Sequence, residues 1–305
     1  MKKSARLLAA FLIIVFFFSC AKSFEEKGTH GYISEIKNWH QHRIENLKKE
    51  NGWLNLVGLY WLKQGENKFG TGKTNDVIFP EGKAPTFIGT FNLTDSVVAV
   101  KITDGIEVTC DGKKVSGMQL KDDTKEEPTV LQYGSLRWFI IRRGEKYGVR
   151  LRDLESPLLK TFKDIETYPV NSDWKITAHL EPYNPPKKIL VPSIIGTVDT
   201  SFVKAAIVFE KDGVTYKLDP LEEGNRYFVI FADETSGKET YGAGRFLYVD
   251  KPDSSGMIYI DFNKAYNPPC CFTKYATCPL PPRQNHLMME ITAGEKTFEG
   301  GAHDN

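Results

Sequence analysis

The polar side chains of one C-terminal stretch, residues 261–285, are the strongest candidates for chemistry in this sequence. Aspartate, asparagine and tyrosine are interleaved there with prolines, and three of the five cysteines, at positions 270, 271 and 278, fall within it. Proline fixes φ at its own position and restricts the residue before it. A long irregular loop in a compact domain is usually functional or disordered, and the aromatic residues argue against disorder. We therefore predict an ordered, rigid loop that forms one wall of a site.

Arg245 is the cation that best complements this loop. It follows the glycines of Gly242-Ala-Gly244 and begins a predicted strand. Asp261 and Asn263 alternate with Phe262, so both point away from the core if Phe262 enters it. The planar guanidinium fork suits a carboxylate of the protein or of a ligand. The predicted ligand-binding residues are Arg245, Asp261, Asn263, Tyr266, Asn267 and Asn285.

Two interpretations of this cluster stay open at the level of sequence. In the first, Arg245 and Asp261 line one cleft and hold a small polar or anionic ligand. In the second, the same residues only pin the proline loop to the sheet, because irregular backbone needs hydrogen-bond partners when it is buried. The glycines before Arg245 likewise suit either a ligand-facing backbone or a tight turn.

The cysteines of the loop allow several states. Cys270 and Cys278 bracket a short segment and are candidates for a disulfide, which would staple the loop. A zinc site would need further ligands from Cys271 and His286, and a nucleophilic cysteine would need a nearby base. Buried free thiols are the remaining alternative. We predict no metal and no cofactor.

Recognisable catalytic patterns are missing from the sequence. No two histidines form a His-x-x-x-His pair, and no Gly-x-Ser-x-Gly nucleophile elbow occurs. The catalytic residues are therefore unknown, and whether the protein is an enzyme stays open. A small-molecule binding protein is favoured, with a hydrolase-like enzyme using the Asp261/Arg245 cluster, or a purely structural envelope protein, as the alternatives.

The N-terminus has the pattern of a targeting segment. A short basic region precedes an apolar run from Leu7 to Phe18, which is too short to span a bilayer as a helix. The run ends in Ser19-Cys20, which resembles a bacterial lipobox. Residues 1–19 are thus predicted to be a lipoprotein signal peptide, Cys20 the lipidated residue and residues 20–29 a tether. The predicted location is the bacterial cell envelope, with the membrane as partner through the lipid anchor.

The rest of the chain is predicted to be mainly β. Residues 30–50 carry apolar side chains at helical spacing and predict one amphipathic helix. Short apolar runs separated by turn residues then continue to the end of the chain, which is typical of a β-sandwich or barrel. Gly144-Glu-Lys-Tyr-Gly148 and Lys211-Asp-Gly213 are predicted to be hairpin turns. We divide the chain into an N-terminal helix with a sandwich-like region at 30–160 and a C-terminal β region at 161–305. The segments predicted as strands include 53–62, 97–102, 136–142, 147–152, 174–180, 188–192, 193–199, 205–210, 226–232, 246–250, 257–262 and 286–293.

The overall charge excludes one class of partner. The 40 Lys and Arg residues nearly balance the 39 Asp and Glu residues. Without a basic excess, nothing in the composition points to nucleic acid.

The motifs together resemble one known family. The segments Thr240-Tyr-Gly-Ala-Gly-Arg245, Asp261-Phe-Asn-Lys-Ala-Tyr-Asn-Pro-Pro-Cys270 and Tyr275-Ala-Thr-Cys-Pro-Leu-Pro-Pro282 are similar to the bacterial and archaeal domain-of-unknown-function family 1684. N-terminal segments such as Gly65-Glu-Asn-Lys-Phe-Gly70 agree with the resemblance. Because that family has no established activity, the resemblance implies a kinship and no function. The chain departs from the family at Cys271 and His286.

Overall fold

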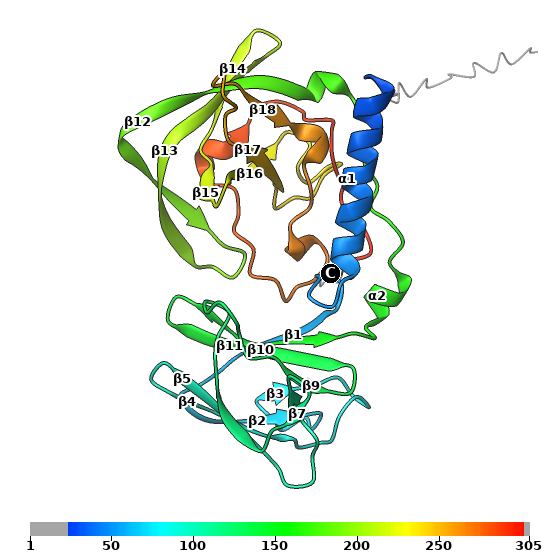
Figure 1. The fold of residues 1–305 in the computed structure, drawn as a ribbon, viewed down its shortest axis with the longest axis vertical. Helices are drawn as coiled ribbons and strands as arrows, with labels where there is room; N and C mark the ends of the chain where they lie inside the picture. The colour runs from blue at the N-terminus through cyan, green and yellow to red at the C-terminus, as the bar shows by residue number, and fades with distance from the viewer. Residues whose placement is uncertain (1–23, 302–305) are drawn as a thin grey trace, which may run out of the picture.

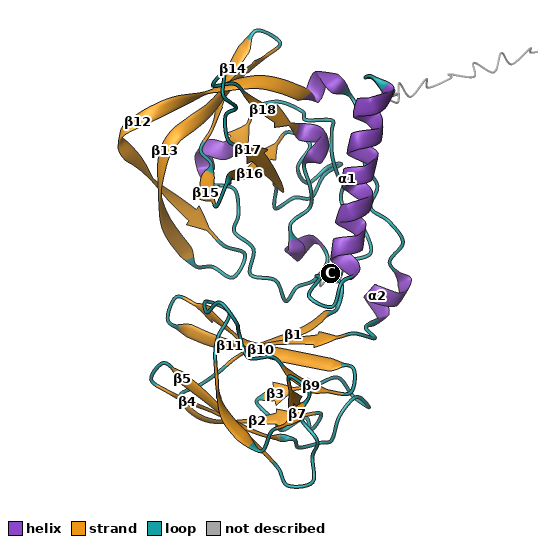
Figure 2. Cartoon of the chain, viewed as in Figure 1, coloured by secondary structure: helices purple, strands orange, loops and turns teal. Residues whose placement is uncertain are grey.

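The computed structural model describes residues 24–301, which form two lobes stacked along the long axis (Figure 1). The N-terminal lobe contains strands β1 to β11. The C-terminal lobe contains helix α1 and strands β12 to β19. The predicted signal peptide, the predicted lipidation site Cys20 and the start of the predicted tether lie outside the described residues. The prediction of a mainly β protein with few helices is confirmed, and its sheets are not closed into a barrel (Figure 2).

The N-terminal lobe consists of two sheets. One has the order β1-β11-β10-β9-β6-β7 and the other the order β3-β2-β4-β5-β8. The predicted turn at Gly144 joins β10 to β11, which pair in register from Arg143↔Lys146 to Leu136↔Asp153. The strand bounds are Leu56–Trp61 (β1), Gly65–Gly70 (β2), Val77–Ile78 (β3), Gly89–Thr94 (β4), Val97–Ile102 (β5), Thr109–Cys110 (β6), Lys113–Lys114 (β7), Gly117–Leu120 (β8), Leu131–Tyr133 (β9), Leu136–Arg143 (β10) and Lys146–Asp153 (β11).

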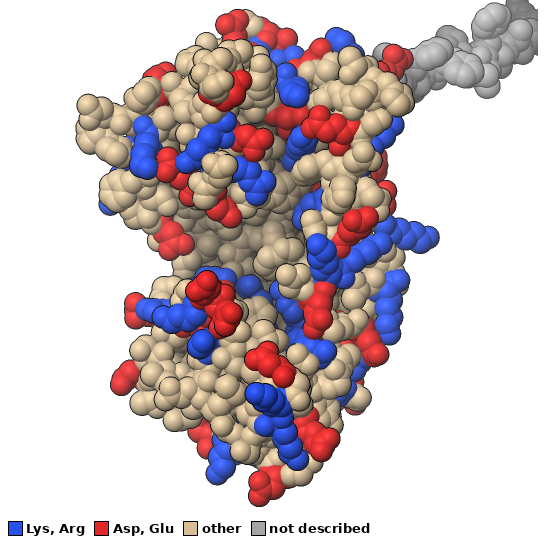
Figure 3. Space-filling model, in the orientation of Figure 1, with Lys and Arg blue, Asp and Glu red and all other residues tan. Residues whose placement is uncertain are grey.

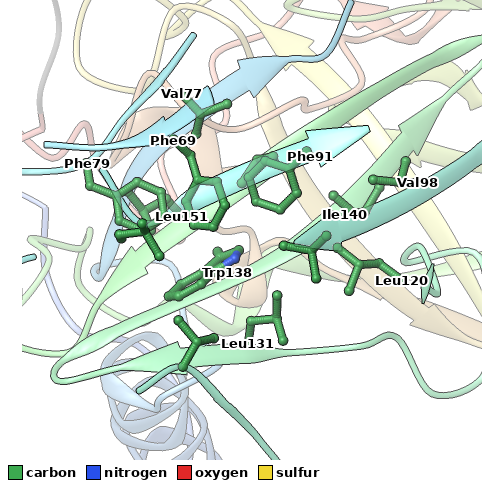
Figure 4. Packing of buried hydrophobic residues seen from close by; sticks show 14 of the residues in the cluster. Phe69, Val77, Phe79, Phe91, Val98, Leu120, Leu131, Trp138, Ile140 and Leu151 are labelled. Atoms are coloured by element: carbon green, nitrogen blue, oxygen red, sulfur yellow. The ribbon is translucent and has the colours of Figure 1, made fainter. Parts of the chain in front are cut away.

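Aromatic side chains fill the core between these two sheets (Figure 4). Phe69 stacks on Phe91 with 4.3 Å between ring centroids, and Phe79 meets Trp138 edge to face at 5.0 Å. In β4, Phe91 alternates with the polar residues Thr90 and Asn92, so one face of that strand is buried. The opposite face of the β10–β11 pair is turned away from this core.

The C-terminal lobe also contains two sheets. Their orders are β14-β13-β12-β18 and β15-β16-β17, with β19 pairing parallel to β16. The turn Lys211-Asp212-Gly213 joins β13 to β14 as predicted, with positive φ at Asp212 and Gly213. The strand bounds are Lys175–Pro192 (β12), Val198–Lys211 (β13), Val214–Leu218 (β14), Leu221–Glu223 (β15), Arg226–Asp233 (β16), Arg245–Asp250 (β17), Ile258–Asp261 (β18) and His286–Leu287 (β19).

Two strands are much longer than predicted. The segments predicted at 174–180 and 188–192 are one strand, β12, whose register shifts between Pro182 and Lys187. The segment predicted as a strand at 193–199 is mostly the turn of this hairpin. Its other arm, β13, includes the prediction at 205–210. The irregular stretch at the register shift contains two prolines, which the sequence pattern separates into two strands. The predicted strand at 286–293 is also wrong, because only His286–Leu287 pairs.

Helix α1, His30–Lys48, precedes the N-terminal lobe in sequence but packs against the C-terminal lobe (Figure 1). The Thr29 side chain caps its first turn by accepting a hydrogen bond from Tyr32 N. Its buried face contains Ile36, Ile44 and Leu47. The described chain therefore passes from α1 on one lobe into the other lobe at β1 and returns through the short helix α2, Pro157–Thr161.

The proline- and cysteine-rich loop runs through the bottom of the C-terminal lobe, next to the N-terminal lobe. It contains short 3₁₀ helices at Phe262–Lys264, Pro269–Cys271 and Arg283–Asn285; another, at Ser172–Trp174, precedes β12. Within the described residues, no helix has the length and apolar character needed to cross a membrane.

Candidate functional site

Arg245 is completely buried and pairs with a different carboxylate from the one predicted. Its guanidinium donates to Asp233 Oδ2 at 2.7 Å and to the backbone oxygens of Ala293 and Ile291. The ion pair of Arg245 is with Asp233 on the neighbouring strand β16 and not with Asp261. That Arg245 and Asp261 line one cleft stays a prediction. The preceding Gly244, at φ +84°, forms a tight turn in which its N–H donates to Tyr241 O.

Asp261 and Asn263 join the loop to helix α1 and to the segment before β12. Asp261 Oδ1 accepts from Tyr32 Oη at 2.8 Å and from Asn263 Nδ2 at 3.0 Å. Asn263 also bonds both backbone groups of Asn171, at 2.9 Å each. Phe262 enters the core as predicted, with no exposed surface. The side-chain amide of Asn263 thus provides hydrogen-bond partners for backbone groups of Asn171 that form no strand pairing.

The other predicted residues also bind protein groups. Asn267 N donates to Glu295 Oε2 at 2.7 Å, and its side-chain amide donates to Lys296 O at 2.7 Å. Asn285 bonds the N–H of Asp219 at 2.8 Å and its carbonyl at 3.0 Å, and donates to Ile230 O at 2.9 Å. Tyr266 exchanges backbone bonds with Phe246.

These contacts favour the loop-clamp interpretation of the predicted cluster. Arg245, Asn267 and Asn285 are fully buried, and their hydrogen bonds go to the chain itself. A ligand-binding role for the six predicted residues stays a prediction.

A cavity of about 490 Å³ lies beneath α1. Of the predicted residues, Asn263 lines it, together with Trp39, His40 and Tyr168. Its buried carboxylate, Glu295, is already occupied by Asn267 N and by Arg43 Nε at 3.3 Å. This cavity therefore offers a mixed surface with little charge left for a ligand.

An arginine-rich sheet face lies where the two lobes meet. Directly opposed residues of antiparallel strands share a face, and the pairs Arg137↔Arg152 and Phe139↔Arg150 place three guanidinium groups beside one aromatic ring. Arg143 extends the row on β10 by alternation. Figure 3 shows a hollow in the surface between the lobes, with Lys and Arg side chains along its N-terminal side.

Arg152 is a buried cation that binds only neutral acceptors. Its side chain is bonded to Asn55 Oδ1 at 2.7 Å and to Gly52 O, and it lies against the rings of Trp53 and Phe139. Among residues 24–301, no carboxylate lies within ion-pair distance of it. Burial lowers the pKa of Arg152 to about 10, so it remains charged at neutral pH.

A second cavity, of about 380 Å³, opens beside Arg152. Most of its surface is apolar. The lining residues are Glu50, Asn51, Pro128, Val130, Gln132, Arg137, Phe139 and Arg152. Arg137 is paired with Glu50 at 2.9 Å, whereas Arg152 has no ion pair among the described residues and feels Glu50 only as a nearby charge.

Arg150 lies farther along the same strand, against the proline loop. One terminal nitrogen donates to Thr277 Oγ1 at 3.2 Å, and the guanidinium lies 5.6 Å from the Trp53 ring centroid. Its Nε is buried and has no acceptor within the described part of the chain. Burial lowers the pKa of Arg150 to about 10, and the nearby Arg143 lowers it further while Asp123 opposes this.

The cysteines of the loop are free thiols in the structure. Cys270 and Cys278 are buried beside each other, and Cys270 N–H points at Cys278 Sγ at 3.2 Å. Cys271 belongs instead to an apolar cluster with Phe272 and Ile44. Among the described residues, no group of His, Cys, Asp and Glu side chains is arranged to hold a metal ion.

The sequence contains a signal for the arginine-rich face that motif analysis overlooks. Arg137, Phe139, Ile141 and Arg143 alternate along β10, and Arg150 and Arg152 alternate along β11. Such alternation ordinarily indicates a face exposed to solvent. Here the face is covered by the other lobe, which local sequence does not reveal.

Comparison with known proteins gives a family match without an activity. Residues 160–296 match the family model described as "Protein of unknown function (DUF1684)". The solution NMR structure of an uncharacterised protein from gene locus rrnAC0354 of Haloarcula marismortui is 29% identical; the match covers 47% of this chain and 81% of that one, with a TM-score of 0.38. No curated protein matches. The family resemblance is thus confirmed for residues 160–296.

Proposed function

We propose that the protein binds a small amphipathic anion, a carboxylate with an apolar tail, in the pocket beside Arg152. The observation that carries this proposal is a buried guanidinium without a carboxylate partner in the described chain, lining a largely apolar cavity of about 380 Å³. Ligand pockets typically have volumes of about 300–1,000 Å³ and a few well-placed polar groups. The pocket beside Arg152 has a volume in this range and contains a few polar groups.

The charge arrangement fits one carboxylate. Arg152 bonds its two neutral acceptors through one terminal nitrogen. The guanidinium has further N–H groups in the same plane, which can donate to both oxygens of a carboxylate. Burying an unpaired cation costs several kcal/mol, so a bound anion would recover part of that cost.

The apolar part of the ligand would lie on the remaining walls. Pro128, Val130 and Phe139 line the pocket without offering charge. A compact inorganic anion could satisfy Arg152 but would leave these walls in contact with water. We therefore favour a carboxylate whose tail covers them, since burying apolar surface contributes about 25 cal/mol per Å².

The cellular setting that we propose is the bacterial envelope. A lipid on Cys20 would hold the protein at a membrane, and the tether would leave both lobes free to meet a small-molecule ligand. We propose no nucleic-acid partner, since the charges of the chain nearly balance. The alternative of a hydrolase that uses Asp261 and Arg245 gains no support. The guanidinium of Arg245 already donates its hydrogen bonds to Asp233 and to backbone oxygens.

Calorimetric titration of the purified protein tests the proposal. Octanoate and benzoate should bind saturably and raise the melting temperature, and octylamine should not. Gln132→Trp should abolish binding by filling the pocket while keeping every arginine. Arg152→Lys should weaken binding about tenfold, because a point charge replaces the bidentate fork. Arg142→Ala is the matched control, since this arginine does not line the pocket and should bind normally.

A second variant tests the charge argument in the opposite direction. Glu50→Gln removes the carboxylate that occupies Arg137 at the pocket, so it should tighten octanoate binding. The proposal is overturned if neither carboxylate binds saturably, or if the Gln132→Trp protein binds as well as the unmodified protein.

A further inference from the structure

The segment between Cys270 and Cys278 brings two thiols together at the lobe junction. Cys270 N–H points at Cys278 Sγ at 3.2 Å, and each thiol influences the ionisation of the other. Tyr241 Oη donates to Cys270 O at 3.0 Å and holds the backbone at one end of the segment. The backbone N–H of Ile194 donates to Cys278 O at 2.9 Å and holds the other end. The pair is therefore positioned by contacts that do not depend on a covalent bond.

The protonation states of the two thiols are split. The hydrogen bond from Cys278 is the largest influence on the pKa of Cys270 and lowers it despite burial. Burial and the hydrogen bond with Cys270 raise the pKa of Cys278. A thiolate is the reactive form of cysteine. Cys270 is therefore suited to attack a disulfide, and Cys278 is suited to act afterwards as the resolving thiol.

The guanidinium of Arg150 lies near the resolving thiol, Cys278. Arg150 interacts electrostatically with Cys278, and its buried Nε has no acceptor within the described residues. Its hydrogen-bond partner Thr277 directly precedes Cys278 in the chain. A guanidinium in this position stabilises a thiolate on Cys278 when one forms.

We propose that Cys270 and Cys278 are a redox-active dithiol that reduces low-molecular-weight disulfides carrying carboxylates. The thiolate of Cys270 attacks one sulfur of the disulfide RSSR, forming Cys270–S–S–R and releasing RS⁻. Cys278 then loses its proton and attacks the Cys270 sulfur, which forms the Cys270–Cys278 disulfide and releases the second RS⁻. Two electrons pass from the cysteine sulfurs to RSSR, and the two protons pass to the released thiols.

The basic surroundings determine the class of disulfide. Arg150 and Arg143 both donate to Thr277 beside the pair. Arg143 is paired with Asp123, so Arg150 is the cation there that has no ion-pair partner among the described residues. The hollow at the lobe junction has Lys and Arg side chains, with some Asp and Glu, along its edge (Figure 3). An anionic disulfide is attracted to this surface and a cationic one is repelled. Because each cysteine is only 5% exposed, the substrate reaches the pair through movement of the segment around Thr277.

Mass spectrometry after incubation with oxidised glutathione tests this activity. The reduced protein should lose the mass of two hydrogen atoms and show a disulfide between Cys270 and Cys278. Cys278→Ser should stop at one glutathionyl group on Cys270. Arg150→Gln should accumulate the same mixed disulfide transiently, because the resolving thiolate loses its cation. The reaction should be at least several-fold faster with oxidised glutathione than with the cationic disulfide cystamine.

The control cysteine is adjacent in sequence. Burial raises the pKa of Cys271 to about 12, so Cys271→Ser should react like the unmodified protein. The rate of Cys270 alkylation should rise with pH through a midpoint below that of an ordinary thiol. The proposal is overturned if Cys270 and Cys278 both remain free at saturating oxidised glutathione. It is equally overturned if Cys278→Ser traps no adduct, or if oxidised glutathione and cystamine react at equal rates.

Discussion

At the scale of single residues, the sequence identifies which side chains are special but not which partner each one takes. Arg245, Asn267 and Asn285 were predicted to matter, and all three are buried polar groups in the structure. Their partners come from segments distant in sequence, such as Ala293 for Arg245 and Ile230 for Asn285. The sequence offers Arg245 more than one aspartate in neighbouring strands, and only the tertiary structure shows that the partner is Asp233.

Arg245→Met should strongly destabilise the protein. The substitution leaves the Asp233 carboxylate without its cation, and breaking a buried ion pair on one side costs about 3–5 kcal/mol. Urea unfolding followed by tryptophan fluorescence measures the loss. Adding Asp233→Asn should recover part of it, because the unpaired charge is then removed.

The control for this prediction is Arg226→Met, which changes an exposed arginine near the ring of Tyr248. Surface changes of this kind usually alter stability by less than about 0.5 kcal/mol. Equal stability losses for the two variants would contradict the clamp role of Arg245.

At the scale of elements, local patterns predict strands well where turns are tight and fail where a strand is interrupted. The Asp212-Gly213 and Gly144 turns were correctly located. Glycine and aspartate adopt positive φ more readily than most residues, and all three positions have positive φ in the structure. The β12–β13 hairpin was divided because prolines interrupt its pattern near the register shift. The placement of α1 against the C-terminal lobe could not be predicted, because an amphipathic helix does not specify which sheet covers its apolar face.

Asn285→Ala should destabilise the sheet edge that the loop covers. Asn285 bonds both backbone groups of Asp219, after β14, and the carbonyl of Ile230 in β16. Each buried group left without a partner costs about 1–3 kcal/mol. Hydrogen exchange should therefore accelerate at Asp219 N–H.

Asn92→Ala is the matched change, because the exposed amide of Asn92 bonds only its neighbour Thr94 among the described residues. It should leave exchange in the C-terminal lobe unaltered. Unchanged protection of Asp219 N–H in the Asn285→Ala protein would show that the amide does not join these strands.

At the scale of the whole molecule, the candidate site arises from the meeting of the two lobes. The proline loop was predicted to be a wall of a site, and it does face the arginine-rich sheet through Thr273 and Thr277. The opposite wall, on β10 and β11, was not predicted. Alternation shows that Arg150 and Arg152 share a face, but not what buries it: Thr277 of the proline loop contacts Arg150, and residues 52–55 contact Arg152.

Thr277→Val should loosen this docking while preserving the shape of the side chain. The Thr277 hydroxyl accepts from both Arg143 Nε, at 3.1 Å, and Arg150, at 3.2 Å. Hydrogen bonds to charged groups contribute about 1.5–3 kcal/mol each, and Arg143 keeps its ion pair with Asp123. The main loss thus falls on Arg150, whose guanidinium has no ion-pair partner among the described residues.

Proteolysis and a double-mutant cycle measure this effect. The Thr277→Val protein should be cleaved faster near α2, where the chain passes between the lobes, whereas Thr94→Val, in an exposed position, should not be. Combining Thr277→Val with Arg150→Gln should cost less stability than the sum of the single changes, because both remove the same contact. If the stability losses of the two single variants add strictly, the Thr277–Arg150 contact does not join the lobes. Other contacts, such as Thr273 with the Leu56 carbonyl, would then join them, and Arg150 would be held independently of the loop.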